Sequence, residues 1–375
     1  MTAKPVRPMR PLDHYVREQQ IELARSIQHR KKIYLDLRFW IYAREAAADE
    51  SADPANRKLL HLLKRGVERG QLVCPISEST FLEVMKQANT TTRRIATARI
   101  IDELSLGVSF TTGRTRIGTE ISHFFYKGAG QTNLYDMQEL VWTKLAYAMG
   151  YTHPFASELD EATELSAQKF VFDEMWRTTL THMITVIGDA WKPDGEERKQ
   201  SAARLDAEMK RPEHTTPSYQ QTYRDEIVGS ADVCQDLAAD AMAGMAERAG
   251  HPPPKKGSAA WEESGRMCRN LVIAAFEQNP ETKSVLRTMH IMASLHAGMR
   301  WEKTAKFTAN HYYDFEHAAG ALAYCDAFFT EGFLSNLVNA KHTGLVSLNS
   351  CATTADVNEA IDILRRFCAK AGPTV

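Results

Sequence analysis

Acidic residues next to predicted strands and helix starts are the first candidates for chemistry in this chain. Asp36 directly follows the apolar run KKIYL, and parallel sheets bind ligands beyond the carboxyl ends of their strands. Asp is also a favoured N-cap, so Asp36 could simply cap the turn or helix that follows. Glu83 has apolar neighbours on a predicted helix, and an ordinary exposed helix charge is its alternative. The role of both carboxylates therefore depends on what lies beside them.

The segment HYYDFEHAAGALAYCDAFFTEGFL supplies the remaining candidates. Asp314 opens a helix of small residues that can pack closely on a sheet, and helical spacing puts His317 on the same face. A predicted short strand then ends at Thr330, with Glu331 next. A lone histidine on such a face is usually packed and satisfied locally, which is the alternative for His317.

Carboxylates of this kind can do chemistry together if the fold gathers them. Three or four of them in one cleft repel one another, so such an arrangement normally needs a cation. Hard oxygen ligands favour Mg²⁺ or Mn²⁺. Such ions can activate a water molecule, orient a phosphate and stabilise the charge on a leaving oxygen. The corresponding reaction is metal-dependent hydrolysis of a phosphodiester bond.

The elements that must position these acids alternate between strand and helix. Near the start of the chain we predict a helix over residues 13–28, strands at KIYLDL and QLVCPIS, and helices at ANRKLLHLLKRGVERG and from ESTFLEV to IDEL, with a break near the Thr run. Near its end we predict helices at DFEHAAGALAYC, EGFLSNLVNAK and ADVNEAIDILRRF, and strands at DAFFT and GLVSL. This order implies a parallel sheet covered by helices, an α/β class.

The segment between these two parts has few strand patterns and many Ala, Met, Glu and Leu residues at helical spacing. We predict that residues 113–303 form a large all-helical insertion, and that residues 1–112 and 304–375 form the two parts of one α/β domain. Loops are expected at KPDGEERKQ, KRPEHTTPS and AGHPPPKKGS, because their Pro and Gly residues interrupt helices.

The acids and their elements together resemble the PIN-domain nucleases. The resemblance is carried by YLDLRFW, CPISESTFLEV and DFEHAAGALAYCDAFFTEGFL, and it covers residues 31–95 and 305–368. In that family an Asp follows the first strand, a Glu lies on a following helix, and an Asp opens a later helix. A strand ending in Thr, with another acid just after it, completes the pattern. The resemblance implies a three-layer PIN-like fold with a central parallel sheet, interrupted here by the insertion.

The resemblance also implies that three acids bind Mg²⁺ or Mn²⁺: Asp36, Glu83 and Asp314. The fourth position is open, because many family members have an Asp one or two residues after the Thr, where this chain has Glu331. Asp326 is the alternative, although its position before the strand points it toward the opposite end of the sheet. Thr330 could hydrogen-bond a carboxylate or the phosphate, and His317 could support the metal ligands.

The function that the resemblance implies is a metal-dependent endonuclease, acting on RNA more often than on DNA, with single-stranded or structured RNA as the partner. One alternative is a catalytically weak PIN-like module that binds RNA or protein. Another is a toxin or defence nuclease whose insertion controls access to the cleft. The insertion could also meet a regulatory partner or a second copy of the chain.

Composition and charge limit these functions. The 375 residues include 46 Lys and Arg and 47 Asp and Glu, so no overall positive field attracts nucleic acid. Contact with RNA would be local, and three basic clusters could contribute or could be ordinary solvated surface: HRKK at 29–32, Arg93 with Arg94, and Lys255 with Lys256.

Other sequence signals narrow the reaction and the compartment. The chain has no C-x-x-C pair, no G-x-x-x-x-G-K-[ST] loop and no H-E-x-x-H helix, so zinc-protease and nucleoside-triphosphatase chemistry are not indicated. Neither a signal-peptide pattern nor a run of about 18 apolar residues is present. We therefore predict a cytoplasmic protein without membrane contact.

Overall fold

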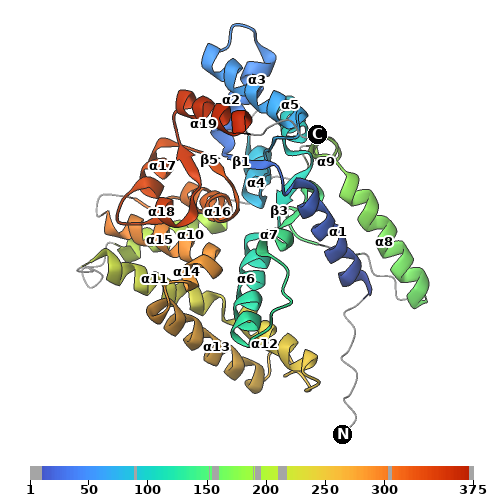
Figure 1. Ribbon diagram of the computed structural model, residues 1–375, viewed down its shortest axis with the longest axis vertical. Coiled ribbons are helices and arrows are strands. Elements are labelled where there is room, and N and C mark those ends of the chain that lie inside the picture. Colours follow the sequence, from blue (N-terminus) through green and yellow to red (C-terminus); the bar gives the residue numbers. More distant parts are fainter. Residues whose placement is uncertain are drawn as a thin grey trace.

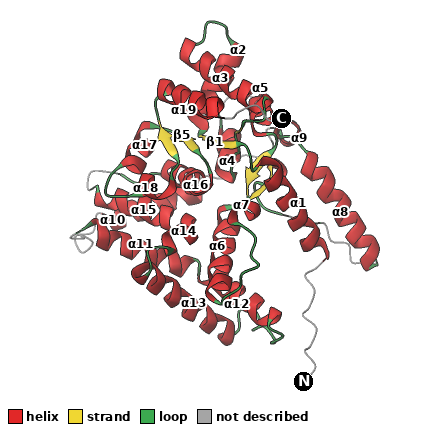
Figure 2. Cartoon of the chain, viewed as in Figure 1, coloured by secondary structure: helices red, strands yellow, loops and turns green. Residues whose placement is uncertain are grey.

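The computed structural model describes residues 11–87, 91–151, 153, 160–188, 190, 196–209, 218–302 and 306–370. Helices surround a small central sheet (Figures 1 and 2). The predicted loop KRPEHTTPS lies mostly outside these residues, as does the predicted boundary between residues 303 and 304. The described half of KPDGEERKQ is already helix, because its Glu, Arg, Lys and Gln residues favour helix over loop. The predicted loop AGHPPPKKGS is confirmed as the connection before the helix that begins at Ala259.

The central sheet is parallel and has the strand order β2-β1-β5-β6. Its strands are β1 (Lys31–Leu35), β2 (Leu72–Val73), β5 (Ala327–Phe329) and β6 (Ala352–Thr354). The register of β1 against β5 runs from Ile33 beside Ala327 to Leu35 beside Phe329. The residues that follow these two strands therefore leave the sheet at the same edge. The predicted α/β class and central parallel sheet are confirmed.

The first part of the chain forms the predicted helices. They are α1 (Pro11–Ile27), α3 (Pro54–Glu68), α4 (Glu78–Lys86) and α5 (Thr91–Ser105), and the predicted break near the Thr run separates the last two. Between β1 and α3 lies a further helix, α2 (Leu37–Ala48), which begins immediately after Asp36.

The last part of the chain also follows the predicted order, with two corrections. Its helices are α16 (Ala309–Tyr324), α17 (Gly332–Asn339), α18 (Leu345–Asn349) and α19 (Val357–Lys370). Asp314 does not open its helix, because that helix begins at Ala309 and Asp314 lies in its second turn. The segment GLVSL is not a strand, because it forms α18 between Gly344 and Ser350, whose φ angles of 66° and 53° are left-handed and delimit a single short helix. Periodicity cannot separate strand from helix in so short an apolar run. The edge strand is β6, directly after α18.

The described residues between 113 and 302 are mostly helical, and among them the all-helical prediction is wrong at a short strand. The helices here are α6 (Gly113–Gly128), α7 (Met137–Leu140), α8 (Glu161–Arg177), α9 (Leu180–Ile187), α10 (Glu196–Met209), α11 (Tyr219–Val233), α12 (Gln235–Arg248), α13 (Ala259–Gln278), α14 (Thr282–Val285) and α15 (Arg287–Trp301). Strand β4 (Trp142–Lys144) pairs antiparallel with β3 (Val108–Phe110). The buried ring of Trp142 stacks on Phe110 with 4.6 Å between ring centroids, and this contact favours the strand.

The hydrophobic core lies on both faces of the central sheet. Side chains of successive strand residues point to opposite faces. Ile33 and Leu35 pack with residues of α2, α3 and α19. Tyr34 and Phe328 pack on the other side with residues of α15 and α16. The sheet is therefore fixed between two helical layers, which holds its carboxyl edge in place.

Candidate active site

The carboxyl edge of the sheet brings together the four acids that the sequence singled out. Asp36 follows β1, and Glu331 follows Thr330 at the end of β5. Strand β2 leads into α4, which holds Glu83, and α16 returns toward β5 so that its first turns, with Asp314, lie at the same edge. Figure 1 shows β1, β5, α4 and α16 next to one another in the centre of the molecule. The direction of the parallel strands therefore decides where these carboxylates meet.

Asp36 is the N-cap of α2, as the local sequence suggested, and its carboxyl also has a raised pKa, which the sequence did not indicate. Its side chain caps α2 and accepts a hydrogen bond from the backbone N–H of Phe39 at 3.2 Å, so the capping alternative is confirmed. Burial raises the pKa of the Asp36 carboxyl to about 6, and Thr330, His317 and the Phe39 N–H oppose that rise. The nearby Glu331 raises it further. The site therefore disfavours a negative charge here unless a cation balances it.

Asp314 lies in the same electrostatic environment. Burial raises the pKa of its carboxyl to about 7, and the positive charge of His317 opposes that rise. The three other acids add to it, because the negative charges of Glu83, Glu331 and Asp36 all act on Asp314. The four carboxylates are thus close enough for their charges to interact.

A buried hydrogen-bonded chain links Glu83 to the sheet. The Nε2 atom of His317 lies 2.7 Å from Oε2 of Glu83, and the Nδ1 atom lies 2.6 Å from the Tyr34 hydroxyl. The Tyr34 hydroxyl in turn lies 2.6 Å from Oγ of Ser77, the N-cap of α4. Burial opposes protonation of His317, but its contacts with Tyr34 and Glu83 outweigh that effect and raise its pKa well above the ordinary value. This raised pKa favours the protonated imidazole, whose positive charge lowers the pKa values of Asp36 and Asp314.

The predicted supporting residues fall into two groups. Thr330 is buried beside Asp36, and its hydroxyl lowers the pKa of that carboxyl, although Oγ1 has no partner of good hydrogen-bond geometry among the described residues. Asp326 lies at the opposite end of β5, where it accepts hydrogen bonds from Lys31 Nζ at 2.6 Å and from the Lys32 N–H at 2.9 Å. The structure thus brings Glu331, and not Asp326, to the other acids.

The donor set fits a hard divalent cation by its chemistry. Carboxylate oxygens are the ligands that Mg²⁺ and Mn²⁺ prefer, and a cation would relieve the repulsion that raises the pKa values of Asp36 and Asp314. Within the described ranges, however, no group of three or more His, Cys, Asp or Glu side chains is already arranged to hold a metal. One oxygen of Glu83 is hydrogen-bonded to His317. Side chains must therefore rotate to bind a cation with three or more of these ligands.

Two cationic residues and an aromatic pair border the acids, and sequence reasoning missed both cations. Arg38 is exposed two residues after Asp36, and its Nε donates to the Tyr42 hydroxyl at 2.6 Å. Lys86 is exposed one turn after Glu83, with Nζ 3.7 Å from the centroid of the Tyr313 ring. The exposed ring of Phe333 lies 5.2 Å from the His311 ring. Both cations lie within three residues of a candidate acid, and this short spacing is the sequence signal that could have identified them.

The basic clusters noted in the sequence do not border the acids. Lys31 pairs with Asp326 at the opposite edge of the sheet. Arg94 is buried, and its Nη1 donates to the Gly188 carbonyl. Lys256 pairs with Asp240 of α12 at 2.9 Å. Arg94 thus has a structural role, and Lys31 and Lys256 form surface ion pairs. RNA that approaches the acids would therefore contact other cations.

Comparison of the chain with protein-family profiles, with curated proteins and with solved structures found no match. Among the helices that the structure describes, none combines the length and apolar character needed to cross a bilayer. Structural support for a function therefore comes from the acids and their surroundings.

Proposed function

We propose that the protein is a metal-dependent endonuclease with a three-layer PIN-like fold that hydrolyses phosphodiester bonds in RNA. The observation that supports this most is the meeting of four carboxylates at the carboxyl edge of a parallel sheet. Each comes from a different part of the chain: Asp36, Glu83, Asp314 and Glu331. Their order and their elements agree with the resemblance to PIN-domain nucleases, and helices on both faces of the sheet agree with three layers.

Each acid has a distinct part in this proposal. Asp36 and Asp314 would hold Mg²⁺ or Mn²⁺, because Asp36 is buried, Asp314 is half-buried, and their negative charges repel each other. The sheet fixes Asp36 and α16 fixes Asp314. Exposed Glu331 and partly exposed Glu83 would complete the ligand set by side-chain rotation. When bound, the cation supplies an activated water and stabilises charge on the leaving oxygen. Thr330 orients the Asp36 carboxyl or the scissile phosphate.

His317 is a positioning residue in this scheme. Its two ring nitrogens connect Glu83 of α4 to Tyr34 of β1, so the imidazole holds α4 at a set distance from the sheet. Because burial excludes water from this chain of hydrogen bonds, the contacts are stronger than they would be at the surface. His317 thereby limits the movement of Glu83 and reduces the repulsion among the acids.

RNA would contact the residues around the acids. Arg38 and Lys86 are exposed and follow Asp36 and Glu83 closely in sequence, so they can contact phosphates. Such a local interaction is consistent with a net charge of −1. Phe333 is 41% exposed, and its ring can stack on an unpaired base. These features favour a single-stranded segment of RNA over a duplex, whose bases are already stacked.

The test is cleavage of end-labelled single-stranded RNA, with matched DNA, in Mn²⁺, Mg²⁺ or EDTA. We expect RNA to be cut in the presence of metal and not in EDTA. Asp36→Asn and Asp314→Asn should each lower the rate by about 100-fold or more, because each removes a charged ligand. Asp362→Asn is the control, since Asp362 lies on α19 and pairs with Arg365. Equal cutting by the wild type and both variants would contradict the proposal.

One alternative is supported by a specific observation. The Glu83–His317 contact and the lack of a formed metal site among the described residues both fit a catalytically weak PIN-like module that binds RNA. Such a module would retain RNA binding in EDTA and would show no cutting in any metal. Asp36→Asn would then leave its RNA affinity the same or raise it, because the substitution removes a negative charge near the phosphates.

A further inference from the structure

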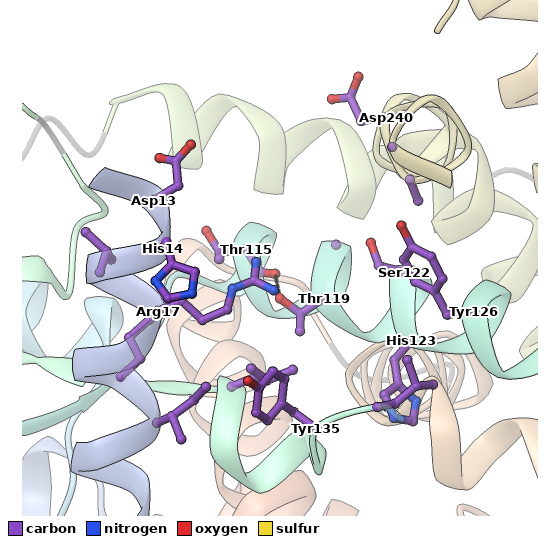
Figure 3. Close-up of a pocket in the computed structure, with 18 of the residues that line it drawn as sticks. Asp13, His14, Arg17, Thr115, Thr119, Ser122, His123, Tyr126, Tyr135 and Asp240 are labelled. Atoms are coloured by element: carbon purple, nitrogen blue, oxygen red, sulfur yellow. Dashed lines mark hydrogen bonds between the residues drawn. The ribbon is translucent and has the colours of Figure 1, made fainter. Parts of the chain in front are cut away.

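A large cavity lies away from the acids, between α1, α6 and α12 (Figure 3). Its volume is about 820 Å³, and residues 133–135, 140, 151 and 153 complete its wall. Small-molecule sites typically have about 300–1,000 Å³. None of the four acids lines it, so whatever binds here is separate from the proposed nuclease site and does not depend on it.

Two arginines line this cavity. Arg17 extends from α1 toward Thr119 of α6 (Figure 3), and Arg248 lines the cavity from α12. Neither guanidinium forms an ion pair with a carboxylate in the part of the chain that the structure describes. Burial lowers the pKa of Arg17, and repulsion by Arg248 lowers it further. Two like charges held near each other indicate a place for an anion.

Most of the acids in the lining already have partners. Glu18 lies 3.1 Å from His14 on the same helix. Asp240 accepts hydrogen bonds from Lys256 Nζ at 2.9 Å and from Trp261 Nε1 at 3.0 Å. Asp13 attracts Arg17 only at longer range. None of these acids therefore pairs with Arg17 or Arg248, which leaves both guanidinium groups for an anion in the cavity.

The rest of the lining suits an aromatic ring and polar groups. Tyr135 is 48% exposed, so one face of its ring is available at the cavity. The Arg248 guanidinium lies over the Tyr126 ring, 4.7 Å from its centroid, which fixes that arginine at the wall. Ser122 adds a hydroxyl from α6. The Nδ1 atom of His123 is buried and has no hydrogen-bond partner among the described residues.

We propose that this cavity binds a nucleotide, with Arg17 and Arg248 on its phosphate groups and Tyr135 against its base. Guanidinium groups match phosphate oxygens in geometry and charge. An exposed tyrosine ring stacks on any of the four bases. A bare phosphate would occupy a small part of the cavity and would leave Tyr135 without a role. The ligand class is therefore a nucleoside phosphate rather than an inorganic anion.

Calorimetric titration of the full chain with ADP, GDP, CDP and UDP tests this proposal, with adenosine and pyrophosphate as partial ligands. EDTA is present throughout, so that no metal carries a nucleotide to the acids. We expect at least one diphosphate to bind about tenfold or more tightly than pyrophosphate or the free nucleoside. Failure of all four to bind at millimolar concentration would overturn the proposal. Pyrophosphate binding as tightly as the best nucleotide would do the same.

Substitutions in the lining locate the site. Arg17→Gln and Arg248→Gln should each weaken nucleotide binding about tenfold or more, because each removes a charge-assisted hydrogen-bond donor. Tyr135→Ala should weaken nucleotide binding and leave pyrophosphate binding unchanged. Arg266→Gln is the matched control, since Arg266 is exposed on α13, pairs with Glu263 and is not in the lining. Arg248 is exposed, so its variant remains informative if Arg17→Gln does not fold.

Nucleotide affinity that is the same in the wild type, Arg248→Gln and Tyr135→Ala would show that the nucleotide binds elsewhere, and it would overturn the assignment. The bound phosphate could belong to a free nucleotide or to the 5′ end of an RNA. Competition with a 5′-phosphorylated RNA oligomer distinguishes the two. Competition by this oligomer at the affinity of the best diphosphate would place an RNA end in the cavity and contradict a free nucleotide.

Discussion

The two edges of the central sheet show how chain direction gives the same residue type different surroundings. At the amino edge, Asp326 precedes β5 and is neutralised by Lys31 and the Lys32 N–H. At the carboxyl edge, Asp36 and Glu331 follow β1 and β5, and no lysine or arginine pairs with Asp36 among the described residues. The carboxylate at the amino edge is paired within the fold, whereas burial raises the pKa values of Asp36 and Asp314 at the carboxyl edge, so that a cation would stabilise their ionised forms. The predictions below test this difference.

The largest expected effect separates the two edges by activity. Asp314→Asn should lower RNA cleavage in Mn²⁺ by about 100-fold or more, because it removes a carboxylate that binds the metal in the proposed site. Asp326→Asn should leave the rate within about twofold of the wild type, because its carboxylate lies at the other end of the strand. Gel assays under single-turnover conditions would measure both. Equal losses in the two variants would remove the basis for distinguishing the edges.

The second prediction concerns pH and metal. The pKa values of Asp36 and Asp314 are raised to about 6 and about 7, above the values of about 3.9 for an unfolded Asp. The folded state therefore binds more protons between about pH 4 and 7, so the free energy of unfolding falls as pH rises through that range. We expect the two groups together to contribute a fall of several kcal/mol in EDTA, since each pKa unit corresponds to about 1.4 kcal/mol.

Thermal denaturation at pH 5 and pH 8 would measure that fall, with urea unfolding for the free energies. Mn²⁺ should raise the melting temperature at pH 8, because it balances the carboxylates that pH has ionised. In Asp314→Asn both the pH dependence and the metal effect should be smaller. If stability depends on pH to the same extent in the wild type and in Asp314→Asn, Asp314 is not the group responsible for the fall.

The third prediction tests the positioning role of His317. His317→Gln should lower cleavage about tenfold, since glutamine retains a polar group but not the charge or the two-sided contact with Glu83 and Tyr34. The loss should appear in kcat rather than in KM, because His317 is buried and does not face the RNA. A change in KM alone would contradict this role.

The smallest expected effect is on stability at the amino edge. Asp326→Asn should lower the free energy of unfolding by about 1 kcal/mol, because it loses a partly exposed ion pair with Lys31 but can still accept from the Lys32 N–H. Urea unfolding would measure the change. A loss of several kcal/mol would mean that this edge is more critical to the fold than its contacts indicate.

Much of the fold could be predicted from local patterns. The strand at β1 and helices such as α3 and α19 have clear patterns of apolar residues, and the structure has them where expected. Prediction was wrong at GLVSL and missed β3 and β4, because these segments are too short for periodicity to decide. Strand β4 is stabilised by the stacking of Trp142 on Phe110, which is a tertiary contact.

The candidate site was partly predictable. The four acids could be named because each stands at a strand end or on a helix next to one, and their charges do interact in the structure. The chain from Tyr34 through His317 to Glu83 could not be predicted, since Tyr34 and His317 lie 283 residues apart in sequence. Tyr34 belongs to a buried strand whose local pattern predicts only packing. No local sequence pattern indicated the cavity, because Arg17 and Arg248 lie far apart in the sequence.

By itself, the sequence determined the alternation of strands and helices, the parallel direction of β1 and β5, and the residues that follow them. These depend on the local pattern of apolar and polar side chains. Only the tertiary structure decided which charges share an environment: Asp326 with Lys31, Glu83 with His317, and Arg17 with Arg248. Electrostatic interaction depends on distance and burial, and the fold sets both by bringing distant segments together.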